Sequence, residues 1–258
     1  MKRLIACVLV TLAAVPAMAG LTYRFESVST GLASTKIAGT VQAEGRDMRV
    51  DLSSGDGTMF KSGAMALSRD GGSTITITDP TNKTYYVLNA ADLSGGGAML
   101  DNMRRMMGFR IENEKVSVRD AGDGGKVEGY PTRKSVVEAS FDIVINAVGQ
   151  TLRMSMNTTT ETWATPDIGA EYANLFQTRA FKTGIEELDT VIAAQSAAIK
   201  GFPLKQVATV RVKQNTVEVT NVTTTTVTAI QKKAVPATVF VMPAGYTKTE
   251  SPFEKMMR

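Results

Sequence analysis

The stretch FDIVINAVGQTLRMSMNTTTETWA, residues 141–164, decides the fold because it reads as two long antiparallel strands joined by a turn. Val, Ile, Thr and Phe favour strands, and they are frequent on both sides of Val148-Gly149-Gln150, where the turn is expected. Strands of this length cross a large sheet. We therefore expect the rest of the chain to contribute further strands to the same sheet.

Shorter strands are predicted on both sides of this hairpin. Leu21, Tyr23 and Phe25 alternate with polar residues, which is the period of a strand with one buried face. The Thr-rich run 223–228 predicts a strand that is able to lie at a sheet edge. Turn sequences separate the strands at intervals of about ten residues, which predicts an antiparallel meander. The predicted strands cover residues 21–29, 34–45, 46–53, 64–70, 73–79, 83–89, 109–120, 126–139, 141–150, 151–164, 203–212, 215–231 and 237–250, with one turn at Asp123-Gly124-Gly125.

An αα-hairpin is predicted over residues 167–200, between the strands. In its second helix, Thr183 and Glu186 have the spacing of a capping box, and Lys200-Gly201 ends the helix. Each helix has one apolar face, formed by Ile168, Tyr172, Leu175 and Phe176 in the first and by Ile185, Leu188, Ile192 and Ile199 in the second. Trp163, just before the hairpin, is expected to pack these helices onto the sheet.

A methionine-rich segment, GGGAMLDNMRRMMGF at residues 95–109, interrupts the predicted strands. As a helix it places five apolar side chains together, those of Met99, Leu100, Met103, Met106 and Met107. Burying such side chains is worth about 1.5–3 kcal/mol each, so this face requires a cover. Three alternatives satisfy this requirement. The segment packs on the protein's own sheet, or it is a lid, hinged at residues 95–97, over an apolar cavity, or its thioethers bind a Cu(I) ion.

The first nineteen residues have the three parts of a cleaved signal peptide. Lys2 and Arg3 precede an apolar run over residues 4–14, and Ala17-Met18-Ala19 forms the expected cleavage site. The apolar run is too short to span a bilayer, which needs about 20 residues. We therefore expect residues 1–19 to be removed, residues 20–258 to form a single domain, and the protein to be periplasmic or secreted.

The composition excludes several classes of catalytic site. The chain has no histidine, and its one cysteine, Cys7, lies in the predicted signal peptide, so a Ser-His-Asp triad, a Cys-His pair and an ordinary zinc site are all excluded. Without Lys2 and Arg3, 27 basic and 25 acidic residues remain, and the net charge of +2 argues against nucleic-acid binding. We therefore expect a binding protein with no enzymatic activity and no cofactor.

Four short motifs carry a resemblance to a known family: GYPTRKSVV (129–137), ETWATPDI (161–168), GFPLK (201–205) and VFVMPAGY (239–246). Together they resemble an uncharacterised family of exported bacterial proteins, a domain of unknown function that is similar to the LolA/LolB/LppX lipoprotein-carrier fold. The resemblance implies a curved antiparallel sheet, or incomplete β-barrel, with helices packed on its concave face. The expected fold class is thus mainly β with α, an α+β fold.

These observations predict a non-catalytic binding protein for a hydrophobic ligand, such as a lipid, an acyl chain or a lipoprotein. The expected apolar lining or lid consists of Met99, Leu100, Met103, Met106, Met107, Phe109, Tyr172, Leu175, Phe176, Leu188 and Ile192. Two alternatives stay open. One is a Cu(I)-binding protein that uses Met99, Met103 and Met106, and the other is a structural or assembly factor of the cell envelope without a small ligand. The sequence predicts no membrane-spanning segment, and it identifies neither the ligand nor the oligomeric state.

Overall fold

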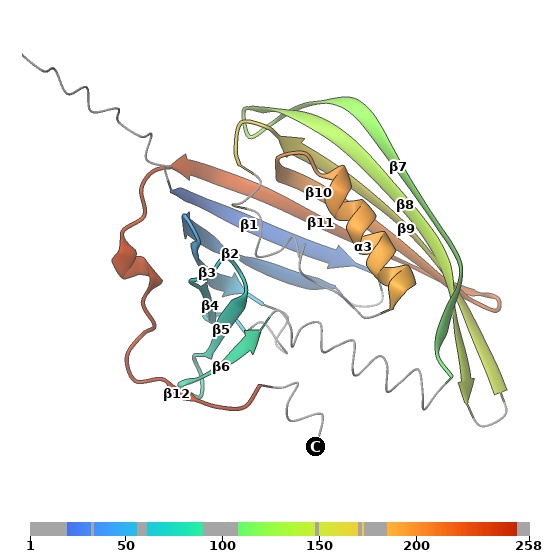
Figure 1. Ribbon diagram of the computed structural model, residues 1–258, viewed down its shortest axis with the longest axis horizontal. Helices are drawn as coiled ribbons and strands as arrows, with labels where there is room; N and C mark the ends of the chain where they lie inside the picture. The colour runs from blue at the N-terminus through green and yellow to red at the C-terminus, as the bar shows by residue number, and fades with distance from the viewer. Residues whose placement is uncertain are drawn as a thin grey trace, which may run out of the picture.

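The computed structural model describes residues 20–31, 34–55, 61–89, 108–147, 150–169, 172 and 185–251. Within these residues one curved sheet of twelve strands makes up most of the structure (Figure 1). Six shorter strands come first along the chain: β1 (Leu21–Thr30), β2 (Thr35–Glu44), β3 (Asp47–Ser54), β4 (Met65–Ser68), β5 (Thr74–Asp79) and β6 (Thr84–Asn89). The other six are β7 (Arg110–Val127), β8 (Tyr130–Ala147), β9 (Gln150–Thr165), β10 (Phe202–Gln214), β11 (Val217–Lys232) and β12 (Thr247–Lys248).

The order of strands across the sheet is β12-β6-β5-β4-β3-β2-β1-β11-β10-β9-β8-β7. Neighbouring strands are antiparallel throughout, except for the parallel pair β12 and β6. Because β12 and β7 end the order on opposite sides, the sheet is open. The predicted mainly β, antiparallel fold is therefore confirmed. Among the described residues, α3 (Glu186–Ala198) is the one α-helix, so the described helical content is smaller than predicted.

The predicted turn at Asp123-Gly124-Gly125 is wrong, because β7 continues through it to Val127. Bulges interrupt the β7–β8 register there, and the Asp123 carboxylate accepts a hydrogen bond from the backbone N–H of Gly125 at 2.8 Å. Gly125 has φ +72°, a conformation that glycine adopts without strain, so the Asp-Gly-Gly sequence forms a bulge. The actual turn is at Glu128-Gly129, and β8 is one continuous strand instead of the two predicted.

The Thr-rich run 223–228 forms part of a strand, as predicted, and that strand, β11, lies inside the sheet and not at an edge. β11 pairs with β1 on one side and β10 on the other. Threonine is β-branched and favours strands at either position, and its frequency does not reveal how many neighbours a strand has. This central pairing joins the C-terminal part of the chain to the first strand (Figure 1).

The strand predicted over residues 237–250 is also wrong. This segment forms a short 3-10 helix, η2 (Ala237–Phe240), and only Thr247–Lys248 pair with the sheet, as β12. Pro236 and Pro243 flank η2, and proline has no N–H to donate to a strand ladder. Phe240 is 1% exposed and packs with residues of β4, so the segment covers one face of the short strands.

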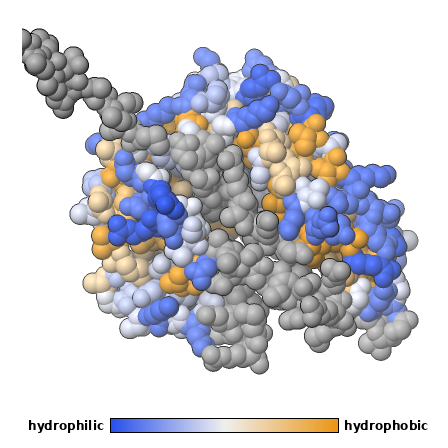
Figure 2. All heavy atoms as spheres, viewed as in Figure 1, coloured by the Kyte–Doolittle hydropathy of each residue, from blue (hydrophilic) through white to orange (hydrophobic). Residues whose placement is uncertain are grey.

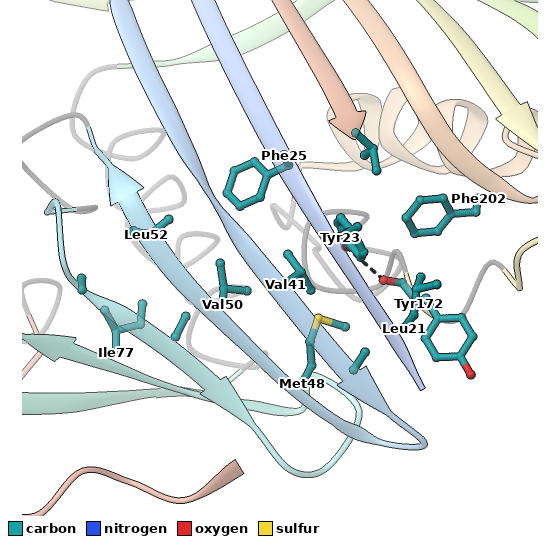
Figure 3. Packing of buried hydrophobic residues seen from close by; sticks show 14 of the residues in the cluster. Leu21, Tyr23, Phe25, Val41, Met48, Val50, Leu52, Ile77, Tyr172 and Phe202 are labelled. Carbon is teal, nitrogen blue, oxygen red and sulfur yellow. Dashed lines mark hydrogen bonds between the residues drawn. The ribbon is translucent and has the colours of Figure 1, made fainter. Parts of the chain in front are cut away.

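The two faces of the sheet differ in what covers them. Side chains alternate between the faces along each strand, and we call the face that carries α3 the inner face and the other the outer face. The largest apolar cluster, here called the main cluster, lies on the inner face of the short strands (Figure 3). Its members include Leu21, Tyr23, Phe25, Val41, Met48, Val50, Leu52, Ile77, Tyr86, Leu88, Ile168, Tyr172, Phe202 and Leu204.

Helix α3 packs on β7 and β8 through a second, smaller inner cluster, here called the helix cluster. Its buried members are Phe109, Ile111, Phe141 and Ile185, with Ile143, Ile145, Met156 and Leu188 partly buried against them. Ile185, and not the predicted Thr183, is the N-cap of α3, and Thr183 itself lies outside the described residues. Within α3 the buried residue is Val191, next to the predicted stripe position Ile192.

Candidate functional site

The inner face between the two clusters carries a strip of hydroxyl and amide side chains. It consists of Ser27, Ser29, Thr160, Thr162, Gln206, Thr223 and Thr225, and we call it the hydroxyl strip. These residues come from β1, β9, β10 and β11, four adjacent strands, so the strip crosses the middle of the sheet. Figure 1 shows α3 lying across the long strands.

Hydrogen bonds within the strip join neighbouring strands. The hydroxyls of Ser29 and Thr223 are 2.6 Å apart, and the Thr225 hydroxyl donates to Ser27 Oγ at 2.9 Å. Across the next strands, Gln206 Nε2 donates to the Thr162 hydroxyl at 3.2 Å. The strip therefore has satisfied polar groups and no charged side chain, and each hydroxyl can exchange its partner for a ligand oxygen.

Gln195 of α3 lies over one end of the strip. Its Nε2 donates to the hydroxyl of Thr160 at 3.4 Å, which places the polar face of the helix against β9. Val210, which pairs with Thr158 two residues from Thr160, is half-buried on the same inner face. On the face seen in Figure 2, hydrophobic side chains gather around the position of α3, with hydrophilic ones towards the rim.

Tyr23 forms the boundary between the hydroxyl strip and the main cluster. Its ring packs edge-to-face on Phe202, with centroids 5.1 Å apart, and its hydroxyl donates to the backbone carbonyl of Tyr172 at 3.2 Å (Figure 3). Burial raises the pKa of the Tyr23 hydroxyl well above its usual value, so the group stays protonated and keeps this hydrogen bond. The site thus has a rigid wall on the side of the short strands.

Four of the residues predicted from the sequence to line a ligand site lie in the described structure, and they do not form one group. Phe109 is buried in the helix cluster, Leu188 packs against that cluster, and Ile192 is half-buried in α3. Tyr172 is buried in the main cluster. The other predicted residues lie outside the described residues, including the whole proposed Cu(I) site: Met99, Leu100, Met103, Met106, Met107, Leu175 and Phe176.

The hydroxyl strip was missed by sequence reasoning. The alternation of Thr223 and Thr225 was the available signal, but it identifies a face only when the neighbouring strands are known. The prediction that Trp163 packs the helices onto the sheet is wrong for α3, the described helix. Trp163 lies on the outer face, where the ammonium groups of Lys134 and Lys205 are 4.5 and 4.9 Å from its ring centroid.

Two hollows among the described residues are lined by both polar and apolar groups. One, of about 480 Å³, crosses the outer face of β7–β11, and the other, of about 300 Å³, lies between the turns at Gly45 and Gly71 and beside Tyr172. Within the described ranges, no group of three or more His, Cys, Asp or Glu residues could hold a metal ion. No helix in this part of the chain is long and apolar enough to cross a membrane.

Comparisons with known proteins give one family match. The family described as a domain of unknown function, DUF4412, matches residues 32–246, and no curated protein matches the sequence. An uncharacterised conserved protein from Thermus thermophilus has a similar structure, with 9% identity, 91% of each chain covered and a TM-score of 0.39. The LolA superfamily protein NE2245 from Nitrosomonas europaea has 6% identity over 87% of this chain and 91% of that one, with a TM-score of 0.33. PNGF-II has 12% identity over 92% of this chain and 32% of that one, with a TM-score of 0.35.

Proposed function

This chain belongs to the DUF4412 family, whose function is unknown, and we propose that it is a non-catalytic binding protein for a hydrophobic ligand. The ligand is a lipid, an acyl chain or the acylated part of a lipoprotein. It lies on the inner face of the sheet, between the main cluster and the helix cluster. The protein works in the periplasm or outside the cell.

One observation carries this proposal: among the described residues, those in the middle of the inner face are not large apolar side chains. Strands β10 and β11 present Gln206, Ala208, Val210, Thr223 and Thr225 there, all half-buried, and all smaller or more polar than the residues of the main cluster. Apolar residues that are only partly buried border this region, such as Ile37 on one side and Met156 on the other. A small-molecule site has this composition, mostly apolar with a few placed polar groups.

The chemistry of the hydroxyl strip favours a ligand with an uncharged polar group within an apolar body. Hydroxyl and amide side chains form hydrogen bonds to ester and amide carbonyls, and the clusters on either side contact hydrocarbon. A charged headgroup would lose its hydration over the strip without gaining an ionic partner, so it is expected to stay in solvent. Acyl esters and N-acyl groups meet these requirements.

The first nineteen residues support export of the protein, because their charged, apolar and Ala-x-Ala parts have the order of a signal peptide. Export would place the protein beside envelope lipids and lipoproteins. N-terminal sequencing of the protein from its own host tests this part. A mature chain that begins at Gly20 supports it, and an intact Met1 argues against it.

A matched pair of substitutions tests the binding face. Val210 and Val207 are both half-buried on β10, and because they are three residues apart they point to opposite faces. Val210→Glu puts a carboxylate on the inner face, and Val207→Glu puts one on the outer face, beside Glu161 and two residues from Lys205. The wild type should bind a fluorescent fatty-acid probe, and Val210→Glu should weaken that binding by tenfold or more, on the order of the cost of an unpaired buried charge.

Native mass spectrometry of the protein purified from its host gives an independent measurement. A bound mass that is extractable into organic solvent supports the proposal.

Equal losses of probe binding in Val210→Glu and Val207→Glu, with thermal unfolding of both unchanged, would place the ligand elsewhere. A wild-type chain that carries no lipid and binds no probe would refute the proposal.

A further inference from the structure

The groove on the outer face lies opposite the proposed lipid site and is built from different side chains. Its floor is the sheet itself, because its lining residues come from β7, β8, β9, β10 and β11. Arg211 lies between the inner-face residues Val210 and Val212, and Asn157 lies between Met156 and Thr158, so both point outward. The groove therefore cannot be part of the inner-face site.

A row of four polar residues runs across this groove. Lys115 of β7 pairs in register with Ser140 of β8, Ser140 with Asn157 of β9, and Asn157 with Arg211 of β10. Three strand spacings separate the backbones of Lys115 and Arg211, a span of about 14 Å. The row thus has a cation at each end, with a hydroxyl and an amide between them.

The charged side chains of the groove have no partners in the part of the chain that the structure describes. Lys115, Glu138, Arg211, Lys213 and Glu218 are all exposed, and none of them forms a side-chain hydrogen bond or ion pair with any described residue. Lys213 and Glu218 even face each other in the β10–β11 register without an ion pair within 4.0 Å.

Elsewhere on the long strands, charged side chains do find partners. Lys134 pairs with Glu161 at 2.6 Å, and Arg153 bridges Asp142 and Glu112 at 2.8 and 2.7 Å. The groove thus holds unpaired charges of both signs together with an amide and several hydroxyls. These groups offer many hydrogen-bond donors and acceptors to a ligand.

We propose that this groove binds an acidic oligosaccharide. Sugar hydroxyls both donate and accept hydrogen bonds, which matches the carboxylates of Glu138 and Glu218 as acceptors and the amide of Asn157 as both donor and acceptor. The acidic groups of the sugar pair with Lys115 and Arg211 at the ends of the row. Three cations against two carboxylates favour a sparsely charged glycan over a dense polyanion such as nucleic acid, which the two carboxylates would repel.

Isothermal titration with defined oligosaccharides tests this proposal on the mature chain. The probes are a hyaluronan oligosaccharide, which carries a carboxylate on every second sugar, a keratan sulfate fragment, which is sparsely sulfated, and a maltooligosaccharide of similar length, which is neutral. Saturable binding of at least one acidic probe, with weaker binding of the neutral one, is expected. Failure of both acidic probes, or equal affinity for the neutral one, would overturn the proposal.

Two variants identify the groove as the place of binding. Arg211→Gln should weaken the acidic probe by about tenfold, the effect of losing one charged hydrogen bond, and Asn157→Ala should weaken it less. The control is Arg133→Gln, which removes the same charge from an exposed arginine paired with Asp120 outside the groove. Equal weakening in the groove variant and the control would show non-specific attraction and contradict the proposal. All three sites are on the surface, and circular dichroism verifies that each variant is folded.

Fatty-acid probe binding to Arg211→Gln separates this inference from the proposed lipid function. It should be unchanged, because Arg211 points away from the inner face. Loss of both activities together would mean that the two faces are not independent, and it would refute a separate outer site.

Discussion

The short-strand end and the long-strand end of the sheet use their inner faces in opposite ways. On β1, β2 and β3 the inner residues Tyr23, Val41 and Val50 are at most 4% exposed. On β10 and β11 the equivalent inner positions, such as Gln206 and Thr225, are half-buried and polar. One continuous sheet therefore has a packed apolar core at one end, and in its middle the described inner residues are small or polar, including the buried Thr160 and Thr162.

This difference indicates that the two parts of the sheet contribute unequally to stability. Burial of apolar surface at the short-strand end supplies most of the stability, because apolar area removed from water is the dominant favourable contribution to folding. In the middle of the sheet, β10 and β11 are held by backbone hydrogen bonds to the strands on both sides. These strands do not need a dense layer of side chains to stay in place. The ligand proposed above would lie there.

The largest expected effect is a loss of stability at the main cluster. Phe202 is 1% exposed and packs edge-to-face on Tyr23. Phe202→Ala should destabilise the protein by about 4–5 kcal/mol, through lost transfer energy, an internal cavity and a lost aromatic pair. Urea unfolding followed by circular dichroism measures the change. A loss below about 2 kcal/mol would mean that this end is not the main source of stability.

A smaller loss is expected in the helix cluster. Phe141 is 7% exposed, but its cluster has few buried members, and a helix is able to settle into the space that a truncation leaves. Phe141→Ala should therefore cost about 3 kcal/mol, at the low end for this substitution. The same unfolding assay gives the comparison. If Phe141→Ala proves more harmful than Phe202→Ala, the ranking of the two ends is reversed.

The sequence was sufficient to predict most of the strands, because apolar and polar residues alternate clearly at positions such as Leu21, Tyr23 and Phe25. It failed where a local signal had two structural meanings. Asp123-Gly124-Gly125 suits a turn or a bulge equally, since both need a glycine with positive φ. The order of strands across the sheet was also not predictable, because the pairing of β11 with β1 joins residues about two hundred positions apart.

The candidate site was predicted less well than the fold. Sequence periodicity finds apolar faces, so it selected Phe109, Tyr172 and Leu188, which the structure places in two separate clusters. The hydroxyl strip is made by four strands that come together only in the folded sheet. Residues such as Ser27 and Thr225 therefore carry no recognisable motif in the linear chain.

The wall between the two regions is tested by removing one oxygen. Tyr23→Phe deletes the hydroxyl that donates to the Tyr172 carbonyl and leaves the ring in place. The expected cost is about 1 kcal/mol, the usual net value of one hydrogen bond. Tyr85 of β6 is the control, because its hydroxyl has no hydrogen bond among the described residues. If Tyr85→Phe lowers the unfolding free energy as much as Tyr23→Phe does, the hydrogen bond between Tyr23 and Tyr172 contributes nothing to stability.

The smallest effect concerns acid stability at the short-strand end. Lys61 Nζ donates a hydrogen bond to the Asp79 carboxylate at 2.6 Å. This bond, together with weaker hydrogen bonds from Asn82 and Thr81, lowers the pKa of Asp79 from 3.8 to about 2. Because the folded pKa is lower than the unfolded one, this contribution is present above about pH 4 and is lost as the pH falls through about 2. It should amount to less than about 1 kcal/mol, since water screens an ion pair at the surface.

Lys61→Ala should return the pKa of Asp79 towards 3.8, because the ammonium donor is the largest cause of the shift. Carboxyl chemical shifts of Asp79 followed by NMR between pH 5 and pH 1.5 measure this directly. Asp79 closes the turn between β5 and β6. The difference in unfolding free energy between the wild type and Lys61→Ala should therefore be smaller at pH 2.5 than at pH 6. A wild-type Asp79 that titrates near 3.8 would show that the lysine does not hold the turn, and that the stability of the short-strand end comes from its buried residues alone.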